Sequence, residues 1–114
     1  MDPDSIRGLM MRLINGTNAG KLKWEETAED EDFRLILDAG IIHIRRSNQM
    51  RPGLGDYALL IFNKNNTLVG RSQPKPDTED MSHLSKLFDL ARNSALNPSG
   101  LLDRLEEELK KRSG

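Results

Sequence analysis

The chain has 114 residues, the length of one domain with a single hydrophobic core, so we expect residues 1–114 to form one domain. Its hydrophobic content of 36%, charged content of 31% and net charge of −1 exclude a disordered chain and any overall attraction to nucleic acid or anionic membranes. The absence of cysteine excludes disulfides, thiol nucleophiles and thiolate metal sites.

No targeting or membrane-spanning signal is visible in the sequence. Met1 is followed by Asp2-Pro3-Asp4 instead of the basic and apolar regions of a signal peptide. No apolar run approaches the ~20 residues that span a bilayer. Together with the absence of cysteine, these features predict a cytoplasmic protein that does not enter a membrane.

An amphipathic helix is predicted over about residues 3 to 15. Asp2 can cap its start and Pro3 suits the first helical position, where the missing N–H costs nothing. Asn15-Gly16 supplies a left-handed stop. Its apolar positions recur at helical spacing and are Ile6, Leu9, Met10 and Leu13.

Five β-strands are predicted next, because apolar and polar residues alternate in short runs. The runs cover residues 22–26, 33–37, 41–46, 57–62 and 67–71, and together they predict an antiparallel meander. Trp24, in the first run, is expected to pack on the core side of the sheet. We interpret residues 28–32 as a solvated acidic hairpin loop and residues 47–56 as a long loop. The run 57–62 is apolar on both faces and is therefore expected to be the central strand.

Two helices are predicted after the strands. Asp77 or Thr78 can cap the first, whose apolar positions are Met81, Leu84, Leu87, Phe88, Ala91 and Ala95. Asn97-Pro98 marks the start of the second, which carries Leu101, Leu102, Leu105 and Leu109 on one side. The predicted fold class is α+β: an N-terminal helix, a five-stranded antiparallel meander, and one or two C-terminal helices packed on one sheet face.

Candidate catalytic and metal-binding residues are few. Asp80 and His83 lie one helix turn apart, but the neighbouring Ser82 points elsewhere, so no hydrolytic triad is predicted. The acidic run Glu29–Asp32 lacks the ligand spacing of an EF-hand. We therefore expect no catalytic residue, no metal site and no cofactor, and the chain is predicted not to be an enzyme. Catalysis through His43 is kept as a third hypothesis.

Basic residues gather in a segment that contains no acid, residues 40–54. Arg45, Arg46 and Arg51 lie in this segment close to His43. Such a patch can contact phosphates, which makes a nucleic-acid-associated protein the alternative hypothesis. Aromatic residues make up only 4% of the chain, which argues against single-strand binding by base stacking.

The order of the elements resembles that of a group of small uncharacterised microbial α+β domains. The resemblance rests on the helix from Asp2 to Asn15, the meander KLKWEETAEDEDFR, the hairpin LLIFNKNNTLVG and the tail LSKLFDLARNSALNPSGLLDRLEEELKK. By fold analogy, this order is also similar to that of type III secretion chaperones. That similarity implies a homodimer that binds an extended segment of a protein partner, and it implies no site residues.

The leading hypothesis is a non-enzymatic protein–protein interaction domain, adaptor or chaperone-like, that forms a homodimer. Apolar residues on the second face of the sheet are the reason, since they need a partner to leave water. The predicted partner surface consists of Ile36, Ile41, His43, Arg45, Arg46 and Arg51. The nucleic-acid alternative would use the three arginines of this set, and no membrane partner is expected.

Overall fold

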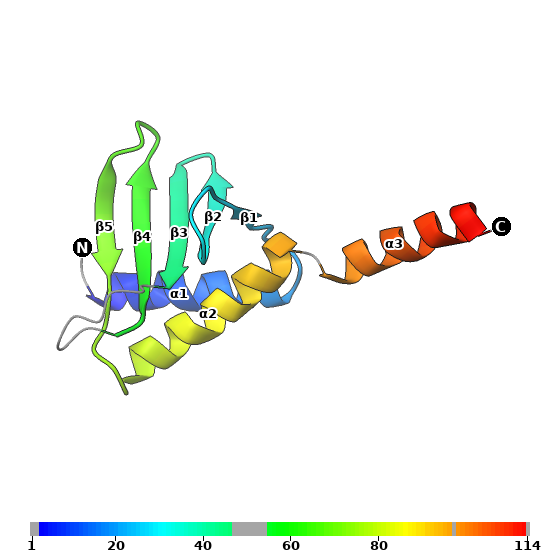
Figure 1. Cartoon of the computed structure of the whole chain (residues 1–114). Coiled ribbons are helices and arrows are strands. Elements are labelled where there is room, and N and C mark those ends of the chain that lie inside the picture. The colour runs from blue at the N-terminus through cyan, green and yellow to red at the C-terminus, as the bar shows by residue number, and fades with distance from the viewer. Residues whose placement is uncertain (1–2, 47–54, 97, 114) are drawn as a thin grey trace.

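A computed structural model of the chain describes residues 3–46, 55–96 and 98–113 (Figure 1). In chain order its elements are α1 (Pro3–Asn18), β1 (Glu25–Glu26), β2 (Asp32–Leu37), β3 (Gly40–Arg46), β4 (Tyr57–Asn63), β5 (Leu68–Ser72), α2 (Glu79–Leu96) and α3 (Pro98–Ser113). The predicted α+β class is confirmed. Most of the predicted loop 47–56, including Arg51, lies outside the described residues.

The strands form one antiparallel sheet in the order β1-β2-β3-β4-β5, which is the predicted meander. β1 is shorter than predicted, with only Glu25 and Glu26 paired to β2. The prediction that residues 57–62 form the central strand is wrong, because β3 is the middle strand and β4 lies between β3 and β5. β4 nevertheless buries three consecutive residues, Ala58, Leu59 and Leu60, which explains its continuous apolar pattern.

One face of the sheet is covered by α1 and α2, which pack against each other (Figure 1). The apolar stripe predicted for α2 is buried from Met81 to Ala91, and Thr78 caps this helix by accepting a hydrogen bond from the Met81 N–H at 3.2 Å. Alternate residues of the strands meet the stripe and form the core with it: Phe33, Leu35, Ile42, Ile44 and Leu59. Of the C-terminal helices, α2 is the one that packs on the sheet.

The end of α1 is fixed by a buried contact with Trp24. The helix continues past the predicted stop at Asn15-Gly16 to Asn18, and Gly20 takes the left-handed conformation with φ of 75°. The Thr17 hydroxyl donates to the Leu13 carbonyl at 2.7 Å and accepts from Trp24 Nε1 at 2.9 Å. Trp24 is 4% exposed, which confirms that it packs on the core side of the sheet.

Replacing Thr17 by valine is expected to lower the free energy of unfolding by about 1–2 kcal/mol. Valine keeps the shape of the threonine side chain, but the buried indole N–H of Trp24 loses its hydrogen-bond acceptor. Urea unfolding followed by the fluorescence of Trp24, the only tryptophan, measures the change. Thr17→Ser keeps the hydroxyl and serves as the control. A valine variant as stable as the serine variant would contradict this account.

The last helix, α3, extends away from the sheet and from the other two helices (Figure 1). Its side chains are described from residue 102 onward, and Leu102, Leu105 and Leu109 are 61%, 45% and 65% exposed. These three leucines of the predicted stripe therefore face solvent in the single chain. Among the described residues, no helix combines the length and the apolar composition that crossing a membrane requires.

Candidate interaction surface

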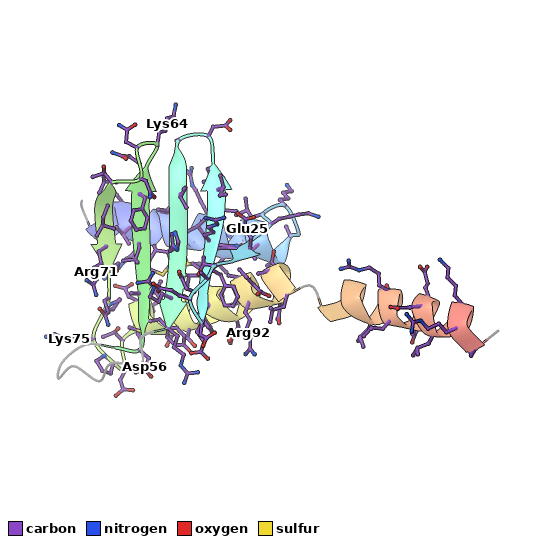
Figure 2. All side chains as sticks on the ribbon, turned by 45° about the horizontal axis from the view of Figure 1, so that its top comes forward. Glu25, Asp56, Lys64, Arg71, Lys75 and Arg92 are labelled. Atoms are coloured by element: carbon purple, nitrogen blue, oxygen red, sulfur yellow. The ribbon has the colours of Figure 1, made fainter. Side chains whose placement is uncertain are left out.

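The second face of the sheet, which we call the open face, is not covered by α1 or α2. In Figure 2 it lies toward the viewer, with both helices behind the strands. Neighbouring residues of a strand point to opposite faces. Since Phe33, Ile42 and Leu59 belong to the core, the residues next to them in sequence point to the open face.

Four apolar residues line up across the open face, and we call them the apolar row. Ile36 on β2 pairs with Ile41 on β3. Phe62 continues the line on β4, and Leu68 continues it on β5. The two ends are strongly exposed, Ile36 at 55% and Leu68 at 48%. With strands ~4.8 Å apart, the row is about 14 Å long.

The adjacent row of the open face carries positive charge, and we call it the cationic row. The pairing of the strands places its members side by side: Arg34, His43, Leu60 and Arg71. Arg34 Nε donates to the Glu25 carboxylate at 3.0 Å, and Glu25 and Arg71 lie toward opposite edges of the sheet (Figure 2). The open face thus presents an apolar stripe bordered by cationic side chains.

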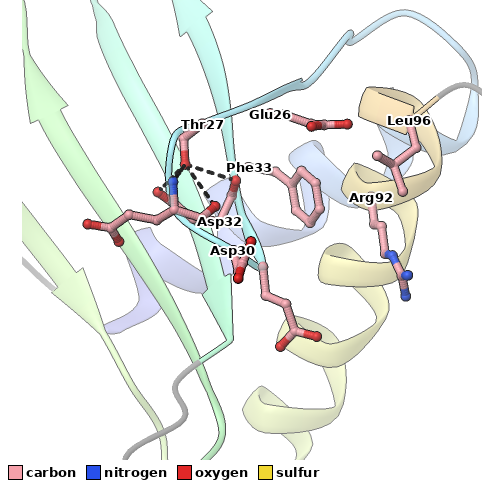
Figure 3. A pocket seen from close by; sticks show the side chains of 9 residues that line it. Glu26, Thr27, Asp30, Asp32, Phe33, Arg92 and Leu96 are labelled. Atoms are coloured by element: carbon pink, nitrogen blue, oxygen red, sulfur yellow. Dashed lines mark hydrogen bonds between the residues drawn. The ribbon is translucent and has the colours of Figure 1, made fainter.

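Asp32 provides a buried negative charge on the same face. It begins β2 opposite Arg45 and is 3% exposed, so the prediction that residues 28–32 are a solvated loop is wrong for Asp32. Its carboxylate accepts hydrogen bonds from Thr27 Oγ1 at 2.9 Å and Arg45 Nη2 at 3.3 Å, and it lies 3.1 Å from His43 Nδ1. Figure 3 shows Thr27 reaching over Asp32 from the loop after β1.

The pKa of Asp32 is set by two opposed effects. Burial alone would raise the pKa of this carboxyl group, because the charged form loses its water. The hydrogen bonds from His43, Thr27 and Arg45, together with the charge of His43, outweigh burial and hold the pKa below its ordinary value of 3.8. The arrangement therefore stabilises Asp32 as a carboxylate.

His43 is half-buried beside Asp32, and its ring lies edge-on to Phe62 with centroids 5.2 Å apart. In a catalytic triad a carboxylate likewise orients a histidine, which then acts as the base. However, His43 is not among the lining residues of four hollows of about 330 to 530 Å³ in the described part of the chain. Its contacts link the apolar row to Asp32.

Arg45 and Arg46, the two described arginines of the predicted basic patch, are separated by the sheet. Arg45 points to the open face, where its Nη2 lies 3.3 Å from the carboxylates of both Asp32 and Glu29. Arg46 is the next residue of β3 and therefore points to the opposite face, with Nη1 3.8 Å from Glu31. A phosphate group approaching either arginine would have to compete with these carboxylates.

A hollow of about 490 Å³ lies next to this acidic loop. Glu26, Asp30 and Phe33 line one side, and Arg92 and Leu96 of α2 line the other (Figure 3). No group of acidic or histidine residues that could hold a metal ion is found in the described parts of the chain. On α2, Asp80 pairs with Arg7 of α1 at 3.0 Å rather than with His83.

Of the predicted partner surface, the structure places Ile36, Ile41, His43 and Arg45 together on the open face and Arg46 on the opposite face, while Arg51 lies outside the described residues. Phe62 and Leu68 belong to the same surface but were not predicted. Asp32 was not predicted to belong to this surface either. Alternate residues of a strand share a face, so extending the predicted strand 33–37 by one residue would have placed Asp32 on the same face as Ile36.

The fold and this surface define a small α+β domain with one covered and one open sheet face. The chain matches no known protein-family model, and no curated protein or solved structure is significantly similar to it.

Proposed function

We propose that the chain is a cytoplasmic, non-enzymatic protein–protein interaction domain that forms a homodimer through the open face of its sheet. The observation that carries the proposal is the apolar row, which runs without interruption over β2, β3, β4 and β5. In a single chain the ends of this row, Ile36 and Leu68, remain about half exposed.

Association through the apolar row is favoured by the hydrophobic effect. Covering a large apolar side chain contributes roughly 1.5–3 kcal/mol relative to leaving it in water. A two-fold axis uses the same surface patch on both copies, so every residue that gains a contact gains it twice. A second copy is thus a partner that any solution of the protein contains.

The nucleic-acid alternative has less support from the geometry. Its two described arginines, Arg45 and Arg46, point to opposite faces of the sheet, and each contacts a carboxylate. Binding that is strong at low salt and that Arg45→Ala weakens would favour it over the interaction domain. We expect no such binding to short duplex or single-stranded DNA.

Sedimentation equilibrium tests the homodimer directly. Because Ile36 is 55% exposed and outside the core, Ile36→Glu leaves the fold intact but places a charge in the proposed interface. It is expected to raise the dimer dissociation constant by about tenfold or more, since each 1.4 kcal/mol of lost contact changes the constant by a factor of ten. Met11→Glu, at a 40% exposed position on α1, is the matched control and should not change the constant.

Two results would count against the proposal. A wild-type chain that sediments as a monomer at all accessible concentrations removes the homodimer. A dimer that Ile36→Glu leaves unchanged and Met11→Glu dissociates would move the interface from the open face to α1.

A further inference from the structure

We infer that the partner of the open face is α3 of the second copy, and that the two chains exchange this helix reciprocally across a two-fold axis. The inference rests on the proposed homodimer and specifies which segment covers the apolar row. It connects two apolar surfaces of the described residues: the apolar row, whose ends Ile36 and Leu68 are about half exposed, and the exposed leucine stripe of α3.

The first step is that α3 needs a partner. Leu102, Leu105 and Leu109 are all exposed, and their spacing places them on one side of the helix. A helix of 16 residues is only slightly longer than the ~15 residues below which an isolated helix is marginal in water. The ion pair between Glu108 and Arg112, at 3.1 Å, is exposed and contributes little. The stability of α3 must therefore come from packing of its leucine side.

The second step is that α3 cannot reach the open face of its own chain. α2 ends at Leu96 on the covered side of the sheet, and one residue separates it from Pro98, the first residue of α3. Helices on opposite faces of a sheet lie about 20 Å apart, taking about 10 Å for each layer. The two steps of chain from Leu96 to Pro98 span at most ~7.2 Å, far less than this separation. A second copy has no such restriction, since its α3 already projects beyond its own sheet (Figure 1).

The third step is that the two surfaces match in size. The rise of a helix places Leu102 and Leu109 about 10.5 Å apart along the axis. The apolar row is about 14 Å long and crosses the strands. A helix lying along the row would cross the strands steeply, as α1 does on the covered face (Figure 1).

The fourth step is that the charges match. At 100° per residue, Glu106 and Glu108 lie on the two flanks of the leucine stripe, roughly 70° and 90° from its centre. The cationic row lies next to the apolar row on the open face. In either direction of the helix, one of these glutamates therefore faces the cationic row, in which Arg34 pairs with Glu25 and Arg71 donates a hydrogen bond to the neutral amide of Gln73. Glu107 lies on the far side of α3 and would remain in solvent.

Cross-linking between two tagged versions of the full chain tests the inference. The natural sequence has no cysteine, so each introduced thiol is unique. One version carries Leu105→Cys, in the middle of the leucine stripe, and the other carries Ile41→Cys, in the apolar row. After mixing and subunit exchange, a short bis-maleimide reagent should shift the 12.9 kDa chains to a mixed covalent dimer on a denaturing gel. Glu107→Cys replaces Leu105→Cys in the control mixture and should give little or no mixed dimer.

Each outcome is decisive when sedimentation equilibrium and tryptophan fluorescence are measured on the same samples. Mixed dimer with Leu105→Cys well above the Glu107→Cys level, in chains that keep the wild-type emission, supports the exchange of α3. Dimers that give the mixed product only at the control level overturn it and leave the homodimer standing; cross-linking between two Leu105→Cys chains would then identify a pair of α3 helices. A monomer overturns both this inference and the proposed homodimer.

Discussion

Replacing Asp32 by alanine is expected to lower the free energy of unfolding by about 2–3 kcal/mol. The loss is large because Asp32 is 3% exposed and is contacted by three side chains, from Thr27, His43 and Arg45. Removing the carboxylate leaves these groups without their common acceptor. The expected loss stays below that of a fully buried ion pair, since Arg45 is 37% exposed and can be rehydrated.

The contribution of Asp32 should also depend on pH. Its pKa in the folded protein lies below the ordinary value of 3.8, so the folded state favours the charged form. Stability from this group is therefore fully present above about pH 5 and is lost as the pH falls through 3.8 and then through the lower pKa of the folded state. The difference in unfolding free energy between the wild type and Asp32→Asn should shrink over that acidic range.

Asp30→Ala is the matched control for Asp32→Ala, because Asp30 belongs to the same acidic run but is exposed. Urea unfolding at neutral pH and at several acidic values gives both comparisons. We expect Asp30→Ala to change stability by less than about 0.5 kcal/mol. Equal losses for the two variants would show that Asp32 is not the charge that holds the loop to β3.

The position of part of the candidate surface follows from the sequence by counting. The turn between β2 and β3 contains only Asp38 and Ala39, and a two-residue hairpin turn fixes the register of its strands. Ile36 must then lie opposite Ile41, which is what the structure has. The information that places Ile36 and Ile41 on one face is therefore local in the sequence.

The positions of Phe62 and Leu68, the other half of the apolar row, cannot be derived from the sequence by counting residues. β3 and β4 are joined by ten residues, 47–56, and such a connection does not fix a register, so the alignment of Phe62 with Ile41 depends on how both strands pack against α2. The pairing of Leu68 with Phe62 has a further cause. The register of β4 against β5 shifts between Ile61 and Phe62, as at a β-bulge. Neither effect leaves a local mark in the sequence.

The burial of Asp32 could not be predicted from neighbouring residues either, because its charged partners come from another strand. An acidic run predicts a solvated loop when only neighbouring residues are considered, and Asp30 in this run is indeed exposed. The partners that make burial of Asp32 tolerable, His43 and Arg45, are 11 and 13 residues away and reach it only through the β2–β3 pairing. Similarly, the leucine spacing of α3 predicts a helix with one side to be covered, but it carries no information about what covers it.

Substituting Gly40 by alanine is expected to destabilise the protein by about 3 kcal/mol and to weaken self-association at the same time. A Cβ atom at Gly40 would overlap the carbonyl oxygen of Phe62 and come within 3.3 Å of its carbonyl carbon. These are backbone atoms of the neighbouring strand, so β3 and β4 must move apart at the end of the sheet that carries the apolar row. Displacing Phe62 from Ile41 would break the continuity of the row.

The control for this substitution has the opposite expected sign. Gly8 lies inside α1, and a Cβ atom there meets nothing within 4 Å. Gly8→Ala should therefore raise the free energy of unfolding by roughly 0.5–1 kcal/mol through helix propensity, and leave the dimer dissociation constant unchanged. If Gly40→Ala were as well tolerated as Gly8→Ala, the close approach of β3 to β4 would be wrong, and with it the alignment of Ile41 with Phe62 on which the proposed interface depends.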